Sequence, residues 1–491
     1  MSTSWWQNKS YYNNSSMIGT VERAMGLWVA AARHCALAAV VALSACTTTP
    51  ESASTEIGRA LNVPASVTAG RDMLNTDLLK RFYDLHDFEP VWDSHPAQAK
   101  AVLKAIAQAG DQGLDPASFH ADLLRHDKNL TPLERELLLS DAALSYADAL
   151  AHGAVPPERR ADNQALVPAA VDVAAVVSQA LDAADPAAML ESLAPTTPGY
   201  RALQQALQTC RSAGPTERRK VLDCQHRIEV NLERQRWLPR AMPADRIVVN
   251  VADERLVAYR DDRPVLSARV IVGQDTQRDQ SPEFQAVIEA SLFNPPWVVP
   301  KDIVTREMLP RISRDPNYLA RNRMIMLPNG EIEQMAGPEA GLGLLMFDMP
   351  NRFDVYLHDT PDRSLFNRVN RRISHGCIRV QNPRELAALL LKEPLRTVDQ
   401  DIATGKTTRH TLPMGVPVFV IYQTAFVDEN GMLRYAPDFY NRDPVLWNLL
   451  HRPPRSTRVS TLAIGPAYVG GSSRLTFNAA GSFNAAGSHV F

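Results

Sequence analysis

The sequence predicts a multidomain protein of the α plus mostly-β class, with a helical domain at residues 75–240 and a β-rich domain at 241–452. The spacing of apolar residues is helical before about residue 240, and it becomes that of short, β-branched strands afterwards. The chain has 491 residues, of which 45% are hydrophobic, so it has enough apolar material for two or three folded cores.

The helical domain is predicted from segments that place apolar residues on one helical face, separated by Gly-Leu-Asp-Pro and Val-Pro-Pro. Helices are expected at residues 78–85, 98–109, 133–152, 199–208 and 227–239. The domain also contains four histidines, His86, His120, His126 and His152. No cluster of Cys, His and Asp at metal-ligand spacing accompanies them, so we expect ordinary core or surface histidines and no metal site.

The β-rich domain is predicted from short segments bounded by Asp-Asp, Gly and Pro. The expected strands are residues 246–251, 255–260, 264–273 and 417–427. Helical and irregular sequence at about 300–345 interrupts the strand pattern, and we interpret it as an inserted cap over the site. Residues 453–491 are rich in Ser, Gly, Ala, Arg and Asn and end in a tandem Phe-Asn-Ala-Ala-Gly-Ser, which predicts a disordered tail.

The N-terminal residues 1–46 have the pattern of a secretory signal peptide, because an uncharged apolar run at 35–45 follows Arg33 and ends in small residues. The run is too short to span a bilayer as a helix of about 20 residues. Leu43-Ser44-Ala45-Cys46 resembles a bacterial lipobox, so Cys46 is expected to become a lipidated N-terminus. A chance cysteine is the alternative. The Ser, Thr, Ala and Pro content of residues 47–74 then predicts a membrane tether.

The five cysteines can be sorted by the oxidising compartment that export implies. Cys35 would leave with the signal peptide and Cys46 would be acylated. Cys210 and Cys224 flank a polar loop between two helical segments, so they are candidates for a disulfide; two buried free thiols are the alternative. Cys377 is left unpaired, which marks it as a candidate reactive thiol.

The densest chemical motif joins Tyr-Leu-His-Asp-Thr at residues 356–360 to Ser-His-Gly-Cys-Ile-Arg at 374–379. A cysteine nucleophile needs thiolate character, and imidazole or positive charge can stabilise the anion. His358 and His375 supply imidazoles, and four arginines supply charge: Arg368, Arg371, Arg372 and Arg379. Glycine before Cys377 allows a tight turn, so the backbone N–H groups of residues 375–377 are candidates for an oxyanion site.

This motif closely resembles the signature of L,D-transpeptidases. The resemblance extends over roughly residues 75–450, through Arg-Gln-Arg-Trp-Leu-Pro at 234–239 and Asn-Pro-Pro-Trp-Val-Val-Pro at 294–300. It is to the long Gram-negative class that carries a scaffold domain, here without the separate peptidoglycan-binding module. The implied fold is therefore a helical scaffold domain followed by a β-rich catalytic domain with a helical cap.

The resemblance implies a role for each matching residue. Cys377 is the nucleophile and His358 the general base, while His375 and Gly376 frame the oxyanion site. Arg379, Tyr356 and Trp297 are candidates for substrate binding, although Trp297 in a strand also fits a core position. The implied reaction is acyl transfer through a thioester, in which a donor tetrapeptide stem loses its terminal D-Ala and a diaminopimelate amine of a second stem is the acceptor.

Three alternatives remain beside this prediction. Water can replace the acceptor, which would make the protein an L,D-carboxypeptidase or endopeptidase, and a non-catalytic wall-binding lipoprotein is the second. A zinc site built from His358, His375 and Cys377 is the third, but a fourth ligand at motif spacing is absent. No cofactor or metal is expected, and the net charge of −2 does not favour nucleic acid. The expected location is the periplasm, at a membrane, most simply the outer membrane of a Gram-negative bacterium.

Overall fold

The computed structural model describes residues 53–62, 67–69, 72–212, 218–451, 476–477 and 483–484. The predicted signal peptide, the lipobox and Cys46 lie outside the described residues, as does most of the predicted tail. Within the tail the structure describes β17 (Thr476–Phe477) and β18 (Phe483–Asn484), which pair antiparallel. The composition of the tail did not predict this pairing of the two Phe-Asn repeats.

The predicted tether is wrong from residue 53 onward. Residues 53–62 form helix α1 (Ala53–Asn62), and β1 (Thr68–Ala69) pairs with β2 (Asp72–Met73). Ile57 and Leu61 are fully buried in the core of the helical domain. They are four residues apart and therefore lie on one helical face, a signal that the surrounding Ser and Thr residues concealed.

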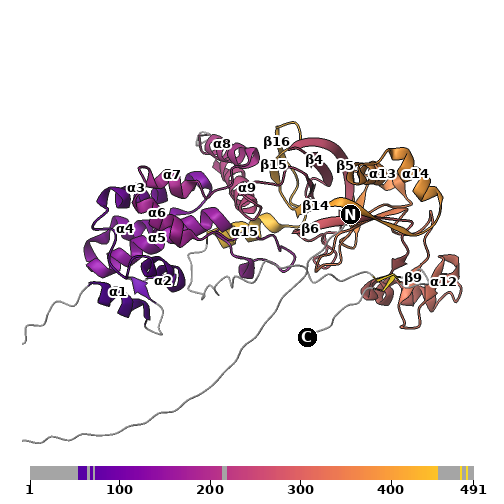
Figure 1. Cartoon of the computed structure of the whole chain (residues 1–491), viewed down its shortest axis with the longest axis horizontal. Coiled ribbons are helices and arrows are strands. Elements are labelled where there is room, and N and C mark those ends of the chain that lie inside the picture. The colour runs from indigo at the N-terminus through magenta and orange to yellow at the C-terminus, as the bar shows by residue number, and fades with distance from the viewer. Residues whose placement is uncertain are drawn as a thin grey trace, which may run out of the picture. The chain divides into compact units, whose positions relative to one another are not determined.

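The helical domain contains all of the helices that the sequence predicted. Those helices are α2 (Thr76–Asp84), α3 (Pro96–Ala107), α5 (Pro132–His152), α8 (Pro198–Ser212) and α9 (Arg218–Arg236). Shorter segments complete it: η1 (Ala109–Gln112), η2 (Pro116–Phe119), α4 (Ala121–Arg125), η3 (Asp127–Asn129), η4 (Pro157–Arg159), α6 (Val173–Leu181) and α7 (Pro186–Glu191). Figure 1 shows these helices as one cluster, coloured indigo to magenta.

The central helix of this domain is α5. Thr131 and Glu134 form a capping box at its start, which satisfies backbone N–H groups that have no partner within the helix. Most of α5 is buried, since other helices surround it. A disulfide joins Cys210 on α8 to Cys224 on α9, with Cα atoms 6.0 Å apart, so it links the two helices that lead to the β-rich domain.

The β-rich domain is built on one sheet that closes on itself. The strand order is β12-β5-β13-β11-β10-β6-β14-β3-β4, and β4 also pairs with β5. The strands are β3 (Arg246–Asn250), β4 (Arg255–Arg260), β5 (Arg263–Gly273), β6 (Phe284–Phe293), β10 (Leu345–Asp348), β11 (Leu357–His358), β12 (Arg372–Ser374), β13 (Ile378–Val380) and β14 (Thr408–Ile421). Closure gives this sheet an interior, which holds one large cluster of buried apolar side chains.

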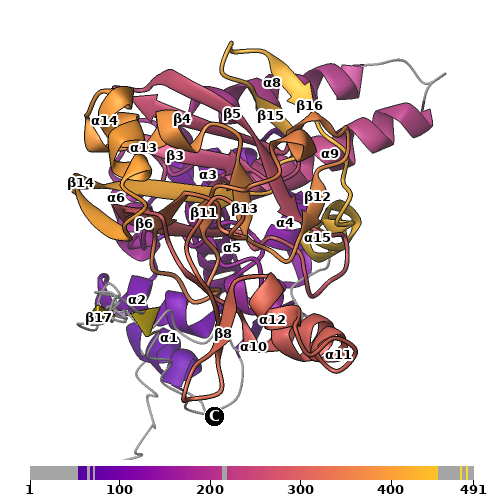
Figure 2. The ribbon, with the colours of Figure 1, turned by 90° about the vertical axis from the view of Figure 1, so that its right-hand side faces the viewer.

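Helices and a hairpin complete this domain. The helices are η7 (Arg363–Asn367), α13 (Pro383–Leu391), α14 (Leu395–Ala403) and α15 (Arg442–Leu450). The hairpin pairs β15 (Ala425–Val427) with β16 (Leu433–Tyr435). Helix α13 begins at Pro383, because proline suits the first turn of a helix, and its Leu386 and Leu390 pack into the sheet core. Figure 2 shows α13 and α14 beside β3 and β4.

The residues predicted as a cap form a small subdomain with its own core. It contains α10 (Lys301–Ile303), the π-helical turn η6 (Val304–Met308), α11 (Leu309–Ile312) and α12 (Tyr318–Arg321). A three-stranded antiparallel sheet joins β7 (Trp297–Val298), β9 (Ile332–Gln334) and β8 (Met324–Met326). Buried Val299, Met308 and Ile332 hold the two parts together. Figure 2 shows these elements below the closed sheet.

The strands differ from the prediction in two places. The strand expected at residues 417–427 is divided, because β14 ends at Ile421 and β15 begins at Ala425 in a separate hairpin. The strands β6 and β10 lie in the middle of the sheet but were not predicted, although β6 alternates buried and exposed residues over part of its length. In the segment that leads to His358, only Leu357 and His358 pair as a strand. Asp354 has a φ of +51°, which takes it out of the extended conformation.

Helix α9 carries buried charges that connect the two domains. Its Asn231 donates to Thr424 Oγ1 at 2.7 Å, and its Arg234 pairs with Asp443 of α15 at 2.5 Å. Glu233 is fully buried and accepts hydrogen bonds from the N–H groups of Ala154 and Val155 and from the Arg236 guanidinium. Each of these charged side chains has an oppositely charged partner, which offsets part of the cost of removing it from water, although Arg234 Nε and Nη2 and Arg236 Nε are buried without a partner in the described structure.

No helix in the described part of the chain is long and apolar enough to cross a membrane.

Replacing Glu233 with Ala should lower the free energy of unfolding by about 3–5 kcal/mol, since it leaves Arg236 buried without its carboxylate. Urea unfolding at pH 7 measures this change. The exposed Glu339 is the matched control, because its replacement with Ala should shift stability by about 0.5 kcal/mol or less. Equal effects of the two substitutions would contradict the assigned role of Glu233.

Candidate active site

The two halves of the sequence motif meet through the parallel pairing of β11 and β13. Leu357 lies opposite Ile378 and His358 lies opposite Arg379, and the Ile378 N–H donates to the Tyr356 carbonyl at 3.0 Å. Side chains alternate along a strand, and directly opposed residues point to the same face. Tyr356, His358, Cys377 and Arg379 therefore share one face of the sheet.

The turn before Cys377 depends on Gly376, whose φ is +114°. This backbone conformation strains residues that carry a Cβ atom. The Ser374 hydroxyl accepts the Gly376 N–H at 3.2 Å and donates to the Cys377 carbonyl at 2.6 Å. A third hydrogen bond comes from outside the motif, since the Ser281 hydroxyl donates to the Gly376 carbonyl at 2.7 Å.

The candidate oxyanion site is narrower than residues 375–377. The N–H of Gly376 already donates to Ser374, so it is not free to bind a substrate oxygen. Within the described chain, neither the N–H of His375 nor that of Cys377 has a hydrogen-bond acceptor. These two groups remain as backbone donors beside the thiol.

Cys377 is partly exposed, and it is the one free cysteine among the described residues. Burial of the sulfur raises the pKa of its thiol above the ordinary value, while the Tyr356 backbone N–H and the Arg379 guanidinium act in the opposite direction. The Sγ atom lies 3.9 Å from the Asp354 carbonyl oxygen. The thiol is therefore favoured over the thiolate, and the Asp354 carbonyl oxygen is an acceptor within its reach.

His358 is buried, and its Nδ1 lies 2.6 Å from the Asp359 carbonyl oxygen. A carbonyl only accepts, so Nδ1 must carry the hydrogen and Nε2 keeps a lone pair. Burial and, after it, the Arg379 charge lower the pKa of His358 to about 3, against the opposing effect of the backbone hydrogen bonds to Asp359 and Leu342. The ring is thus a neutral imidazole that can accept a proton at Nε2. Between the described side chains of His358 and Cys377 there is no hydrogen bond in this structure.

Asp359 fixes the backbone that holds this imidazole. Its carboxylate accepts the Leu344 N–H at 3.0 Å and pairs with Arg363. Gly343 has a φ of +64°, and a Cβ atom there would lie 2.6 Å from the Asp359 side chain. Asp359 was not among the predicted site residues, although it lies within the His-Asp-Thr segment at residues 358–360.

The cap contacts the motif through its π-helical turn. Glu307 on η6 lies 2.5 Å from His375 Nε2, and Arg306 pairs with Asp302 at 2.7 Å and with Asp279 at 3.5 Å. His375 therefore uses its side chain to bind the cap, while its backbone faces the site. Glu307 had no sequence signal, because the contact joins residues 68 positions apart.

Among the other candidate residues, some lie near the thiol and others bind elsewhere in the domain. Arg379 is close enough to affect both the thiol and His358, and its Nε is buried without a partner in the described structure. Arg371 pairs with Glu254 at 3.1 Å, and Arg372 stacks over Phe439, so both brace the domain instead. Trp297 is partly buried on the same small apolar cluster as Tyr356.

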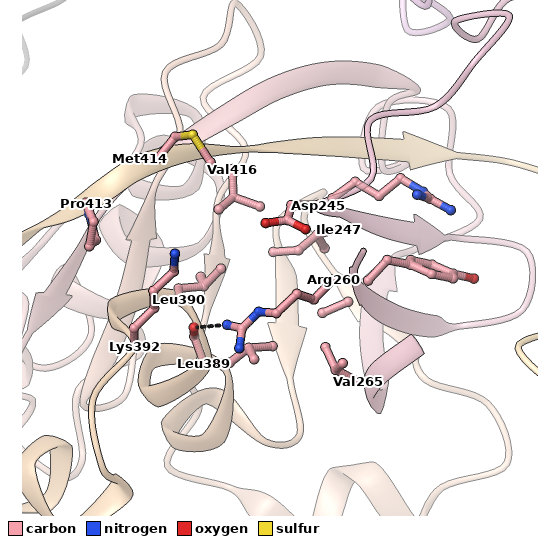
Figure 3. Close-up of a pocket in the computed structure, with 13 residues that line it drawn as sticks. Asp245, Ile247, Arg260, Val265, Leu389, Leu390, Lys392, Pro413, Met414 and Val416 are labelled. Atoms are coloured by element: carbon pink, nitrogen blue, oxygen red, sulfur yellow. Dashed lines mark hydrogen bonds between the residues drawn. The ribbon is translucent and has the colours of Figure 1, made fainter. Parts of the chain in front are cut away.

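Two further features lie outside this motif. A pocket between β3, β4, β14 and the end of α13 is lined by residues such as Asp245, Arg260 and Met414, and Arg260 donates to the Leu389 carbonyl there at 2.9 Å (Figure 3). None of its lining residues belongs to the motif. Glu393, Asp401 and His410 place possible ligand atoms within 4.8 Å of one another, but all three side chains are partly exposed.

Comparison with known proteins finds both domains. Residues 77–207 match the family described as the scaffold domain, and residues 244–420 match the YkuD family, described as the L,D-transpeptidase catalytic domain. A protein of Haemophilus influenzae named "Putative L,D-transpeptidase" is 29% identical over 390 residues, covering 74% of this chain and 78% of that protein. The predicted fold class is confirmed.

Solved structures give weaker similarities. The "Ldtfm-avibactam carbamoyl enzyme" is 13% identical, with a TM-score of 0.19, and the match covers 37% of this chain and 49% of that one. An L,D-transpeptidase from Mycobacterium smegmatis is also 13% identical, with a TM-score of 0.20 and coverage of 36% and 58%. This chain thus spans about half of the length of these structures, and such low scores carry no argument. The two domain matches and the Haemophilus relative agree with each other: this chain has a scaffold domain followed by an L,D-transpeptidase catalytic domain of the YkuD type.

Proposed function

We propose that the protein is a peptidoglycan L,D-transpeptidase that cross-links stem peptides through a thioester on Cys377. The observation that carries this proposal is the parallel pairing of β11 and β13, which puts Cys377, His358 and Arg379 on one sheet face. Acyl transfer requires a nucleophile, a base and groups that stabilise a developing negative charge. This face of the sheet carries all of them, because backbone N–H groups without an acceptor among the described residues lie next to these side chains.

The first half of the reaction forms the thioester. His358 Nε2 takes the Cys377 proton as Sγ attacks the donor carbonyl, and the carbonyl oxygen becomes an oxyanion. We expect the N–H groups of Cys377 and His375 to bind that oxyanion, because neither has an acceptor among the described residues. The carbon–nitrogen bond to D-Ala then breaks, and His358 returns its proton to the leaving amine. The enzyme keeps the acyl group as a thioester.

The second half transfers the acyl group. The neutral amine of a diaminopimelate side chain attacks the thioester carbonyl and loses a proton to His358. The carbon–sulfur bond breaks, the new amide forms, and the proton returns to Cys377. A neutral imidazole is suited to both halves, because it can accept a proton each time.

The neutral resting pair agrees with the electrostatics of the site. The pKa of the thiol is raised and the pKa of His358 is lowered, so each group favours its neutral form at pH 7. A thiolate and imidazolium pair would face the desolvation of both charges. Proton transfer is therefore expected to accompany attack on the substrate rather than precede it.

Substrate contacts stay predictions. Arg379 is expected to hold a peptide carboxylate through two parallel hydrogen bonds, and its buried Nε without a partner supports this role. Tyr356 and Trp297 pack on one apolar cluster at the base of the cap, where they can contact the stem peptide. The signal peptide, the lipidation of Cys46 and a periplasmic, membrane-anchored location also stay predictions.

Hydrolysis is the second candidate function, since water can intercept the same thioester. The contact between Glu307 and His375 places the cap beside the motif, while both side chains and Cys377 stay partly exposed, so water can reach the site. The products formed from a tetrapeptide donor distinguish the two reactions.

The wild-type protein, incubated with disaccharide tetrapeptide, should yield a cross-linked dimer with loss of D-Ala, as measured by mass spectrometry. Cys377→Ala should give no product, because no other described thiol is free. His358→Gln should lower the rate by about 10²–10⁴-fold, the range for general base catalysis. Replacement of the exposed His126 with Gln is the matched control and should leave the rate unchanged.

Tripeptide without dimer would instead identify a hydrolase. Unchanged product formation by Cys377→Ala would sink the thioester mechanism, and the absence of any product from the folded wild type would leave the non-catalytic alternative.

Alkylation of Cys377 by iodoacetamide should depend on pH with an inflection above about 8.5, the ordinary thiol value. The raised pKa means that thiolate appears only as the pH rises through that higher value. His358, with a pKa of about 3, stays neutral across this range and should add no inflection between pH 5 and 8. The measurement follows adduct mass against time at each pH. An inflection below pH 7 would indicate a thiolate and imidazolium pair instead.

A further inference from the structure

Among the described residues, Ser281 is the one from outside the motif whose side chain binds the backbone of the turn before Cys377. Ser281 is fully buried in the loop that follows β5. Its hydroxyl accepts the Gly273 N–H at 2.9 Å and donates to the Gly376 carbonyl at 2.7 Å. Both capacities of the hydroxyl are used, so its orientation is fixed.

The bond to Gly376 determines where the Cys377 N–H points. The Gly376 carbonyl and the Cys377 N–H belong to one planar peptide, and the chain has no cis peptide bonds among its described residues. In a trans peptide the C=O and N–H groups point in opposite directions. Holding the carbonyl toward Ser281 therefore turns the N–H away from Ser281, and this N–H has no acceptor in the described structure.

The neighbouring peptides have other anchors, whereas this one does not. The peptide before Gly376 is held by the Gly376 N–H on Ser374, and the peptide after Cys377 is held by Ser374 and by the Ile378 N–H on Tyr356. Glycine at residue 376 would also let the intervening peptide rotate easily. Ser281 supplies the hydrogen bond that opposes this rotation.

We propose that Ser281 is a positioning residue that holds the Gly376–Cys377 peptide so that the Cys377 N–H faces the developing oxyanion. This inference rests on the proposed acyl-transfer function and deepens it. The Ser281 hydroxyl binds the Gly376 carbonyl and not the Cys377 sulfur. Its effect on the reaction therefore passes through the Gly376–Cys377 peptide.

Ser281 is itself held by residues from α15 and from the segment before it. Its N–H donates to the Tyr440 hydroxyl at 3.1 Å, and that hydroxyl donates to the Gly273 carbonyl at 2.7 Å. The buried Arg442 donates to the Ser281 carbonyl at 3.2 Å and to Glu283 at 2.9 Å. A Cβ atom at Gly273 would lie 2.0 Å from the Asp279 carbonyl oxygen, so glycine is required for this close approach.

The same loop is bound by the scaffold domain. Glu283 donates its N–H to the Asn163 carbonyl at 2.7 Å and accepts the Ala165 N–H at 2.8 Å. The Gln164 side chain also donates to the Glu283 carboxylate at 2.9 Å. A segment between α5 and α6 thus fixes residues 280–283, and through Ser281 it supports the oxyanion donor.

The test compares two reactions of the Cys377 thiol in Ser281→Ala. Acylation by a carbapenem β-lactam passes through an oxyanion, whereas alkylation by iodoacetamide does not. Loss of one oxyanion donor costs about 10²–10³-fold, so misplacement of the Cys377 N–H should slow acylation by roughly 10- to 100-fold. Alkylation should stay within about twofold of wild type. Both rates are followed by intact mass, with the melting temperature measured in parallel.

Two further variants complete the design. Ser291→Ala also removes a fully buried serine hydroxyl, but that hydroxyl has no partner in the described structure, so both rates should be unchanged. Tyr440→Phe removes the support behind Ser281 while leaving its hydroxyl, so it should slow acylation less than Ser281→Ala does. It also provides a second test if Ser281→Ala folds poorly.

Equal slowing of both reactions in folded Ser281→Ala, or no slowing of acylation, would overturn the proposal. If wild-type protein is acylated by the β-lactam but does not process stem peptides, the proposed function fails while the Ser281 comparison still stands. A wild-type thiol that alkylates but never acylates would overturn both.

Discussion

The parallel pairing of β11 and β13 is the constraint on which the site depends. It is only two residues long on the β11 side, yet it sets His358 opposite Arg379 and brings residues separated by 21 positions into register. Each strand is held by a longer neighbour, since β11 pairs with β10 and β13 pairs with β5. The closed sheet therefore fixes a short ladder that could not persist alone.

The rest of the molecule supports the turn that follows from this pairing. Gly376 makes the turn, Ser374 holds the peptides on either side of the Gly376–Cys377 peptide, and Ser281 reaches the carbonyl of that peptide from the loop after β5. That loop is bound by α15 through Arg442 and by the scaffold domain through Glu283. The scaffold domain therefore also supports the site, because its hydrogen bonds reach Glu283, two residues from Ser281.

Sequence patterns predicted the parts of this arrangement that are local. Helix α5 was predicted from its apolar spacing, and the motif around Cys377 was predicted from its residue types and a glycine. Contacts between distant segments had no local signal, as the Glu307 to His375 and Ser281 to Gly376 bonds show. The predicted oxyanion set was too broad, because Ser374 takes the Gly376 N–H. The tether prediction was wrong at α1, because Ile57 and Leu61 pack into the core of the helical domain although the segment around them is polar.

The central claim is that the acyl group passes through Cys377, and trapping the acyl-enzyme tests it most directly. Wild-type protein is mixed with a tetrapeptide donor in the absence of acceptor, quenched in acid and digested for peptide mapping by mass spectrometry. We expect a tripeptide adduct on the peptide that contains Cys377, and hydroxylamine should remove it because it cleaves thioesters. An adduct on another residue, or turnover of the donor by the Cys377→Ala protein, would contradict it.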